Sequence, residues 1–256
     1  NDTVMVFNGD VLSGMDLEGI LTTHHDKDAD VTMHLLNVAD PRAFGCVPTD
    51  SNGRVTAFLE KTEDPPTNQI NAGCYVFKRS VIESIPANRV VSVERETFPG
   101  LLAEGRLVVG HVDNSYWRDM GRPDDFTRGS SDLVRGIAPS PLIEGKTGES
   151  LVDPSAGIAG GVLLLSGTAV GRGSEVGAGS RLEGTVVFDG VRIEPGAIIH
   201  NSIIASGAHI GANAVIENCV IGEGAHIGAR CELLDGMRVF PGVSIPDAGV
   251  RFSSDA

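Results

Sequence analysis

Two aspartates in this sequence each follow a short hydrophobic stretch, and carboxylates in such positions have the chemistry of magnesium ligands. Asp10 closes the run at residues 4–7, and Asp119, far later in the chain, follows Ser115-Tyr116-Trp117. Mg²⁺ is usually held by one or two carboxylates, with phosphate and water oxygens completing its shell. If the fold brings the two aspartates together, they form a metal site for a phosphate-bearing substrate. Taken singly, each is an ordinary turn or cap residue.

Other residues with ligand-binding chemistry lie between the two aspartates. Glu60 and Lys61 end a strand-like run and offer a carboxylate and an ammonium, although an exposed surface pair is the plainer interpretation. Gly9, Gly45 and Gly73 let a ligand approach the backbone closely, or they simply serve turns.

Strand and helix patterns place these residues in an α/β domain that covers residues 1–135. Apolar or alternating runs predict strands at residues 4–7, 31–35, 44–47, 54–59, 70–77 and 107–112. Helices are predicted after the cap Asp16, before Pro86, over residues 94–104 with Pro99 awkwardly inside, and from Pro123 onward. Ligands of open α/β sheets bind beyond the carboxyl ends of strands, which is where Asp10 falls.

The second half of the chain carries an internal repeat. From Val170 to Leu233 aliphatic residues recur in steps of six, six and five, and this set of three steps is one repeat. The fourth position of each repeat is glycine, at Gly173, Gly190, Gly207 and Gly224. The pattern predicts stacked coils with three flat faces, one inward aliphatic side chain on each face, and small residues at the corners. It resembles the hexapeptide-repeat left-handed parallel β-helix, over residues 152–250, and residues 136–151 are predicted to be a linker.

A catalytic site on the β-helix itself is a second possibility. His209 and His226 occupy the same position in successive repeats and are therefore expected to stack, and many hexapeptide-repeat proteins are acyltransferases that use a histidine as general base. The plainer interpretation is a solvated ladder, because the same column contains Glu175 and Arg192. The coils also run without the interrupting loop that such enzymes use to build a pocket.

Composition excludes several classes of protein. The 256 residues carry 34 acidic and 20 basic side chains, for a formal net charge of −14, which argues against a nucleic-acid partner. No apolar run approaches the length of a membrane span, and no signal peptide opens the sequence. The four cysteines form no C-x-x-C pair, so a reduced, cytoplasmic setting is the default expectation.

Five motifs in the first part of the chain, taken in order, resemble the sugar-nucleotide pyrophosphorylases. They are FNGD (7–10), FGCV…GRVTAFLEK (44–61), INAGCYVF (70–77), SVERETFP (92–99) and YWRDMG-x-P (116–123). Members of this family form an NDP-sugar and pyrophosphate from a sugar 1-phosphate and an NTP. With a β-helix following, the motifs look most like the mannose-1-phosphate guanylyltransferase branch. The resemblance implies a partial Rossmann-like nucleotidyltransferase domain and then the β-helix.

The resemblance also implies roles for single residues. Asp10 and Asp119 match the two Mg²⁺ ligands, Lys61 matches the lysine on the sugar phosphate, and Glu60 matches the acid that binds sugar hydroxyls. Asn71 and Gly73 match sugar-contacting positions, Gly45 matches a backbone contact to the sugar, and Gly9 precedes the first metal ligand.

One hallmark of the family is absent from the 256 residues. Nothing matches the G-G-x-G-T-R-L-type loop that holds the NTP phosphates, and the sequence starts at Asn1 without a methionine. We therefore expect a chain without the N-terminal nucleotide-binding segment, which retains the sugar-phosphate half of the site and is inactive or nearly so alone.

The motifs also depart from the family at two positions, where Arg122 and Thr62 replace the usual threonine and proline. A non-catalytic regulatory or scaffold homologue is the main alternative. Self-association through the β-helix is expected, because its faces are flat and regular.

Overall fold

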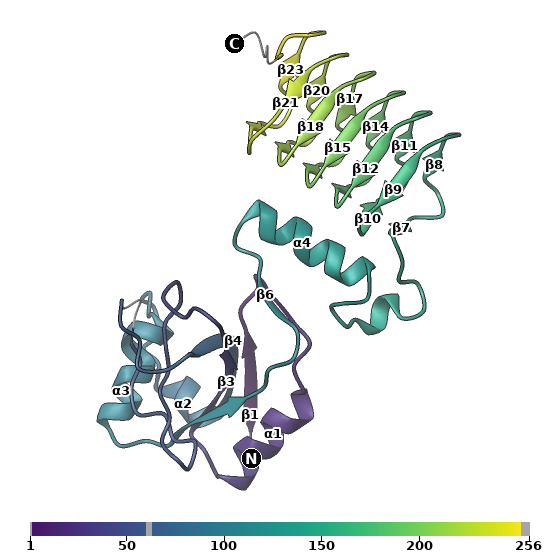
Figure 1. Ribbon diagram of the computed structural model, residues 1–256. Helices are drawn as coiled ribbons and strands as arrows, with labels where there is room; N and C mark the ends of the chain where they lie inside the picture. The colour runs from purple at the N-terminus through teal and green to yellow at the C-terminus, as the bar shows by residue number, and fades with distance from the viewer. Residues whose placement is uncertain (1, 60–62, 252–256) are drawn as a thin grey trace. The chain divides into compact units, whose positions relative to one another are not determined.

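The computed structural model describes residues 2–59 and 63–251 (Figure 1). The chain divides into two compact units, residues 1–117 and residues 118–256. In the described part of the chain, no helix combines the length and apolar character needed to cross a membrane.

A four-stranded sheet forms the centre of the first unit, in the order β1-β4-β3-β5. Its strands are β1 (Thr3–Phe7), β3 (Val31–Asn37), β4 (Gln69–Lys78) and β5 (Val108–Val112). β4 runs antiparallel to both β1 and β3, and β3 runs parallel to β5. Because β1, β3 and β5 point the same way, their carboxyl ends share the edge of the sheet at which β4 begins. β2 (Val11–Ser13) follows β1, and β6 (Trp117–Asp119) spans the boundary between the units.

Helices cover both faces of this sheet. They are α1 (Leu17–Asp26), α2 (Arg79–Ser84) and α3 (Phe98–Ala103). Successive side chains of a strand alternate between faces, so Cys74 and Val76 of β4 pack with α1, whereas Tyr75 and Phe77 pack with α2 and α3. The rings of Phe77 and Phe98 stack with centroids 6.1 Å apart. Asp16 caps α1 as predicted, since its carboxylate accepts a hydrogen bond from the Glu18 N–H.

The structure modifies two of the predicted elements. Residues 44–47 and 54–59 do not form continuous strands; the described part of this hairpin pairs only at isolated positions such as Cys46–Leu59 and Thr49–Val55. The second segment also borders β5, where Val55 donates its N–H to the Val108 carbonyl at 2.9 Å. The predicted helix over 94–104 is interrupted, with a π-helical turn η1 (Val93–Thr97) before α3. Pro99 then falls in the first turn of α3, where its missing N–H costs nothing.

The second unit consists of a helix, a connecting segment and a solenoid. Helix α4 (Pro123–Val134) starts at proline as predicted, and a 3₁₀ turn η2 (Pro141–Ile143) follows. α4 packs against the start of the solenoid, where Ser131 Oγ donates to the Ser166 carbonyl at 2.6 Å. The division of the chain into compact units falls between Trp117 and Arg118, whereas the domain boundary predicted at residue 135 stays a prediction.

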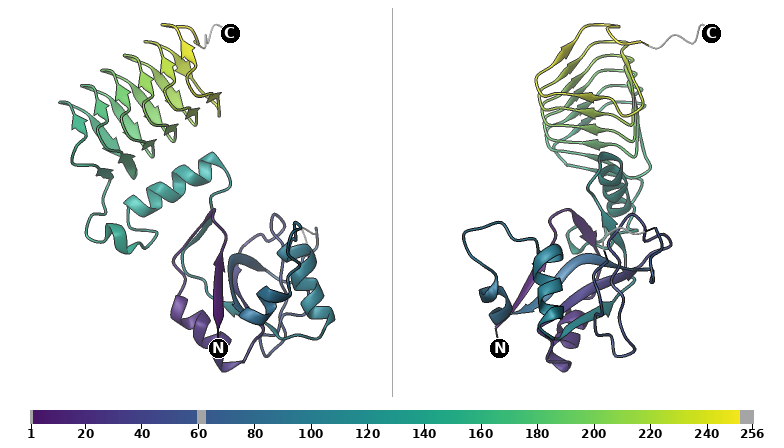
Figure 2. Two further views of the ribbon diagram at one scale, coloured as in Figure 1. Left: turned by 180° about the vertical axis from the view of Figure 1, so that it is seen from behind. Right: turned by 90° about the vertical axis from the view of Figure 1, so that its left-hand side faces the viewer.

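Three parallel sheets form the solenoid, and the stacked coils are visible in Figure 2. One sheet contains β7 (Ser150–Val152), β10 (Thr168–Val170), β13 (Val186–Val187), β16 (Ile203–Ile204), β19 (Val220–Ile221) and β22 (Arg238–Val239). Another contains β8 (Gly157–Ile158), β11 (Glu175–Val176), β14 (Arg192–Ile193), β17 (His209–Ile210), β20 (His226–Ile227) and β23 (Ser244–Ile245). The third contains β9 (Leu163–Leu165), β12 (Arg181–Glu183), β15 (Ile198–His200), β18 (Val215–Glu217) and β21 (Glu232–Leu233).

The predicted repeat determines the packing of these coils, and the predicted β-helix fold is confirmed. The inward aliphatic residues from Val170 to Leu233 are each at most 3% exposed. Strand partners are one repeat apart in the central coils, as in Ile193↔Ile210, and the last coil is one residue longer, as in Ile227↔Ile245. At one corner, glycines adopt φ between 61° and 69°, a conformation that other residues rarely take: Gly173, Gly190, Gly207, Gly224 and Gly242.

Amides on one face link each coil to the next. Gly177 N–H donates to the Ile193 carbonyl, and Glu194 donates in the same way to Ile210. Gly211 and Gly228 repeat this bond to Ile227 and Ile245, and the next residue in the column is Pro246. The ladder is therefore continuous through the central coils, and the inward side chains form one core.

Candidate functional site

The candidate site lies in the first unit, at the sheet edge where β1 ends and β4 begins. Gly9 and Asp10 follow β1 and are exposed. The register that pairs Phe7 with Cys74 brings the end of β1 next to the start of β4, and Asn8 N–H donates to the Gly73 carbonyl at 2.7 Å. Two segments far apart in the sequence, each carrying predicted site residues, are thus joined by their backbones.

Glycine is required at position 73. Its φ of +79° is rarely adopted by other residues, and a Cβ there would lie 2.9 Å from Asn8 Nδ2. The Gly73 N–H donates to Asn71 Oδ1 at 3.1 Å, so the tight backbone also orients the Asn71 side chain.

The Asn71 amide is fixed by three hydrogen bonds. Besides accepting from Gly73, it donates through Nδ2 to the Tyr75 hydroxyl at 2.7 Å and to Glu94 Oε1 at 3.0 Å. Both of its N–H groups are therefore used, and only acceptor capacity on Oδ1 is left for a ligand. Tyr75 is 2% exposed, and burial raises its pKa to about 12, so the hydroxyl stays neutral.

Glu94 contacts the candidate site, although sequence reasoning gave it no role. It belongs to the motif at residues 92–99 and reaches Asn71 from the π-helical turn η1. Its carboxylate is exposed at the same sheet edge, so its second oxygen can accept from a polar ligand. The acidic pattern of the motif was visible in the sequence, but its contact with a residue on an earlier strand was not.

Gly45 lies beside Asn71, and its contact with a sugar stays a prediction. Its carbonyl accepts from Asn71 N–H at 3.4 Å, and a Cβ at Gly45 would meet only the Leu59 carbonyl, at 3.6 Å. Leu59 is held by paired backbone bonds to Cys46. Glu60 and Lys61 lie outside the described residues, although Leu59, directly before them, is beside Gly45.

The motif containing Asp119 is attached to the same edge through Trp117. Trp117 Nε1 donates to the Ala72 carbonyl at 2.9 Å, and its ring packs edge-on against Phe44 with centroids 5.7 Å apart. Asp119, two residues later, falls in the second unit, where it is exposed and its Oδ1 accepts from Gly121 N–H at 2.9 Å. A metal ion shared by Asp10 and Asp119 stays a prediction.

The chemistry of both aspartates fits a magnesium ion. Among the described residues, the Asp10 carboxylate has no hydrogen-bond or ion-pair partner, and Asp119 uses one oxygen for its turn. Hard carboxylate oxygens with free lone pairs are what Mg²⁺ prefers. No group of three or more His, Cys, Asp or Glu side chains in residues 2–59 and 63–251 is arranged to hold a metal, so the predicted ion depends on two carboxylates.

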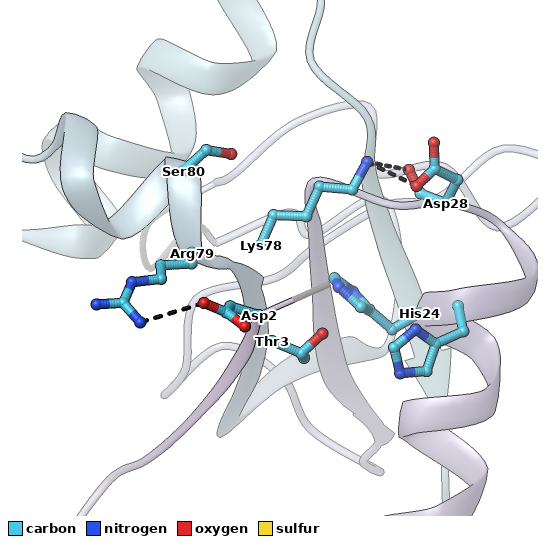
Figure 3. A pocket seen from close by; sticks show the side chains of 8 residues that line it. Asp2, Thr3, His24, Asp28, Lys78, Arg79 and Ser80 are labelled. Atoms are coloured by element: carbon cyan, nitrogen blue, oxygen red, sulfur yellow. Dashed lines mark hydrogen bonds and ion pairs between the residues drawn. The ribbon is translucent and has the colours of Figure 1, made fainter.

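A pocket at the opposite end of β4 contains no predicted site residue (Figure 3). It encloses about 390 Å³ and is lined by Asp2, Thr3, His24, His25, Asp28, Lys78, Arg79 and Ser80. Its cations are already paired, Lys78 Nζ with Asp28 Oδ1 at 2.8 Å and Arg79 with Asp2 at 3.3 Å. This pairing does not favour an anion site.

The solenoid places His209 and His226 side by side, as the repeat predicted. They are strand partners, with Nδ1 atoms 2.9 Å apart. Cys219 and Cys231 are buried in the solenoid, and burial raises the pKa of Cys219, which disfavours a reactive thiolate. Acyl transfer at these histidines stays an alternative prediction.

Comparisons with known proteins agree with the motifs. A model of the nucleotidyl transferase family matches residues 1–136, and a model of the GMPPB C-terminal domain matches residues 146–250. A protein of Mycobacterium tuberculosis named mannose-1-phosphate guanylyltransferase is 64% identical over all of this chain, which covers 71% of that protein.

More distant relatives carry similar names. Mannose-1-phosphate guanylyltransferase 1 of Arabidopsis thaliana is 36% identical over 69% of this chain. A putative mannose-1-phosphate guanyltransferase of Sulfolobus acidocaldarius is 29% identical, also over 69% of the chain. The matched part spans about half of each of these two relatives, 50% and 47% of their lengths.

Proposed function

Because the chain belongs to the nucleotidyl transferase family, we propose that it takes part in forming an NDP-sugar, specifically GDP-mannose, from mannose 1-phosphate and GTP. The observation that best supports this proposal is a single sheet edge that gathers site residues from segments far apart in the sequence. These residues are Asp10, Asn71, Gly73 and Glu94. That edge lies beyond the carboxyl ends of three strands, where α/β sheets bind ligands.

The proposed sugar subsite is rich in hydrogen-bond acceptors. Asn71 keeps only acceptor capacity, and Glu94 offers a free carboxylate oxygen, so both suit the hydroxyl donors of a sugar. Glu60 adds a further acceptor in the proposal, and the backbone at Gly45 and Gly73 allows the sugar ring to approach closely. A set of acceptors fixed in this way selects a sugar by the positions of its hydroxyls.

The proposed chemistry is an in-line attack by a sugar-phosphate oxygen on the α-phosphorus of the NTP, with pyrophosphate as the leaving group. Little covalent work falls to the protein, because positioning and charge neutralisation dominate phosphoryl transfer. Lys61 would hold and neutralise the sugar phosphate. Asp10 and Asp119 would hold Mg²⁺, which when bound supplies positive charge to the crowded phosphate oxygens.

We further propose that the 256-residue chain binds the sugar phosphate but does not turn over alone, since its sequence contains no glycine-rich NTP loop. The test compares this chain with a chimera in which a segment carrying a G-G-x-G-T-R-L-type loop precedes residue 1. We expect Mg²⁺-dependent pyrophosphate release from mannose 1-phosphate and GTP by the chimera only. A folded chimera that releases no pyrophosphate with any sugar phosphate would refute the proposal, and tight nucleotide-sugar binding without turnover would favour a non-catalytic homologue.

Replacing Glu94 by glutamine is expected to weaken sugar-phosphate binding about 10-fold while leaving the fold unchanged. The substitution keeps the shape but removes a charged acceptor, and hydrogen bonds to charged groups contribute roughly 1.5–3 kcal/mol. Calorimetric titration of the chain with mannose 1-phosphate measures the effect. Glu104→Gln is the matched control, because Glu104 is an exposed carboxylate at the end of α3 without a side-chain partner among the described residues. Equal affinity of the two variants would contradict a role for Glu94.

Self-association and a cytoplasmic location also remain proposals. In the sheet that begins with β7, the outward row is apolar over the first five strands, and it ends at Arg238 on the sixth: Leu151, Ala169, Val186, Ile203 and Val220. A flat, regular, apolar row of this kind suits packing against a second copy of itself. The four cysteines of the chain are buried and free, as is usual in a reducing compartment.

A further inference from the structure

The solenoid sheet that begins with β8 carries, on its outer face, a pair of histidines whose ring nitrogens face each other. His209 of β17 and His226 of β20 are strand partners on adjacent coils. Their Nδ1 atoms are 2.9 Å apart, and the rings meet edge to face with centroids 4.5 Å apart. At this distance one nitrogen donates a proton and the other accepts it, so the two rings share one proton.

A carboxylate determines which of the two rings accepts the hydrogen bond between the Nδ1 atoms. Glu194 Oε1 lies 3.3 Å from His209 Nε2 and 3.0 Å from Arg192 Nε. A proton on His209 Nε2 is therefore donated to Glu194, which leaves a lone pair on His209 Nδ1. The shared proton then belongs to His226 Nδ1. A carboxylate on the far nitrogen of a histidine is also the usual support of metal-bound imidazoles.

We propose that His209 and His226 form a binding site for a divalent transition-metal ion, Zn²⁺, Ni²⁺ or Cu²⁺, with Glu194 orienting His209. Neutral imidazole nitrogens suit these metals. The ion takes the place of the shared proton and binds both Nδ1 lone pairs. That proton moves through solvent to Nε2 of the same His226 ring, so both rings stay neutral and no net proton is released.

The geometry needs only a small adjustment. Two nitrogens bound tetrahedrally at about 2.0–2.1 Å would lie roughly 3.3–3.4 Å apart, slightly more than the observed 2.9 Å. His226 is exposed, so a rotation of its ring can open this gap. Within the described residues no third protein ligand is close enough, and water would complete the shell. Arg192, the strand partner of His209 on the preceding coil, would repel a metal ion, but its ion pair with Glu194 offsets the positive charge of the guanidinium.

This site differs in chemistry from the proposed magnesium site. Mg²⁺ prefers oxygen ligands and has little affinity for a pair of imidazoles, whereas Cu²⁺ and Ni²⁺ favour nitrogen. The two sites are therefore separable by the choice of ion, and the inference about the histidines does not depend on the enzymatic proposal.

The test is titration of the untagged full chain with Cu²⁺ and with Zn²⁺, followed by calorimetry and, for Cu²⁺, by visible absorption. We expect one ion bound per chain, with His209→Ala and His226→Ala each losing at least about 10-fold in affinity. Glu194→Gln should lose about 10-fold to 100-fold without removing a ligand, as supporting carboxylates do elsewhere. His25→Ala is the matched control, because His25 is an exposed histidine in the first unit. This variant should bind the metal ion with the affinity of the parent.

Equal metal affinity in the parent and in the His209→Ala, His226→Ala double variant overturns the site. So does a loss in His25→Ala as large as that in His226→Ala. An unchanged affinity in Glu194→Gln overturns the orienting role of the carboxylate. If an alanine variant unfolds, His226→Gln repeats the measurement with a side chain that keeps volume and polarity but removes the imidazole.

Discussion

An Asp10→Asn variant should lose turnover by at least about 1,000-fold in the chimera that supplies the nucleotide loop. Asparagine keeps the size of the side chain but removes the charge that would hold Mg²⁺. A metal ion contributes several kcal/mol of transition-state stabilisation, and each 1.36 kcal/mol corresponds to about a factor of ten in rate. Because the Asp10 carboxylate is exposed and makes no hydrogen bond or ion pair among the described residues, the fold should be unaffected. Pyrophosphate release at saturating Mg²⁺ and circular dichroism measure the two effects.

The same experiment tests whether Asp10 and Asp119 act on one ion. Asp119→Asn should cause a comparable loss, and the double variant should be little worse than either single variant, because residues that act as a unit are not additive. Asp26→Asn, at the exposed end of α1, is the control and should keep full activity. Activity within a few-fold of the parent in a folded Asp10→Asn chimera would exclude the metal role.

Substituting Gly211 by alanine should destabilise the solenoid strongly. A Cβ at Gly211 would overlap Ala229 N and lie 2.6 Å from the Gly228 carbonyl carbon, both backbone atoms of the next coil. Neither atom can move without separating the two coils, so we expect a loss of about 3 kcal/mol or more, at or above the upper end of typical overpacking. Thermal and urea unfolding followed by far-ultraviolet circular dichroism measure this loss.

Gly160→Ala provides a matched comparison within the same solenoid. A Cβ at Gly160 would meet nothing within 4 Å, and its φ lies outside the left-handed region, so the change should stay within about 0.5 kcal/mol. A similar loss for both substitutions would contradict the close approach of the coils as the cause of the destabilisation.

The solenoid could be predicted from sequence in detail because its information is local and periodic. The repeat of six, six and five was sufficient to pair Ile193 with Ile210 and His209 with His226, and both pairings are confirmed. The corner glycines of the same repeat were found from their spacing, since only glycine adopts their conformation easily.

The first unit was less predictable because its decisive contacts join distant segments. The strands at residues 4–7 and 70–77 could be found from their apolar runs. Their antiparallel pairing, which joins Asn8 to Gly73, leaves no local pattern. Continuous strands were predicted for the hairpin at 44–59, but its described segments pair only at isolated positions.

The candidate site was predictable only in part, for the same reason. Motif resemblance was sufficient to select Gly45, Asn71 and Gly73, which the structure brings to one edge. It gave no role to Glu94, because the hydrogen bond of Glu94 to Asn71 depends on where η1 packs against β4. The pairing of Asp10 with Asp119 remains a prediction, as do the roles of Glu60 and Lys61.

The column of amides that links the coils has a consequence for the behaviour of the protein at high concentration. Each coil donates one backbone N–H of this column to the coil that follows, from Gly177, Glu194, Gly211 and Gly228. The next position in the column is Pro246, which has no N–H to donate. A foreign strand that approached this rim would find a missing donor and the bulk of a pyrrolidine ring. Proline at this position therefore disfavours the pairing of a further strand with this edge of the sheet, which is the step by which stacked coils would extend into a fibre.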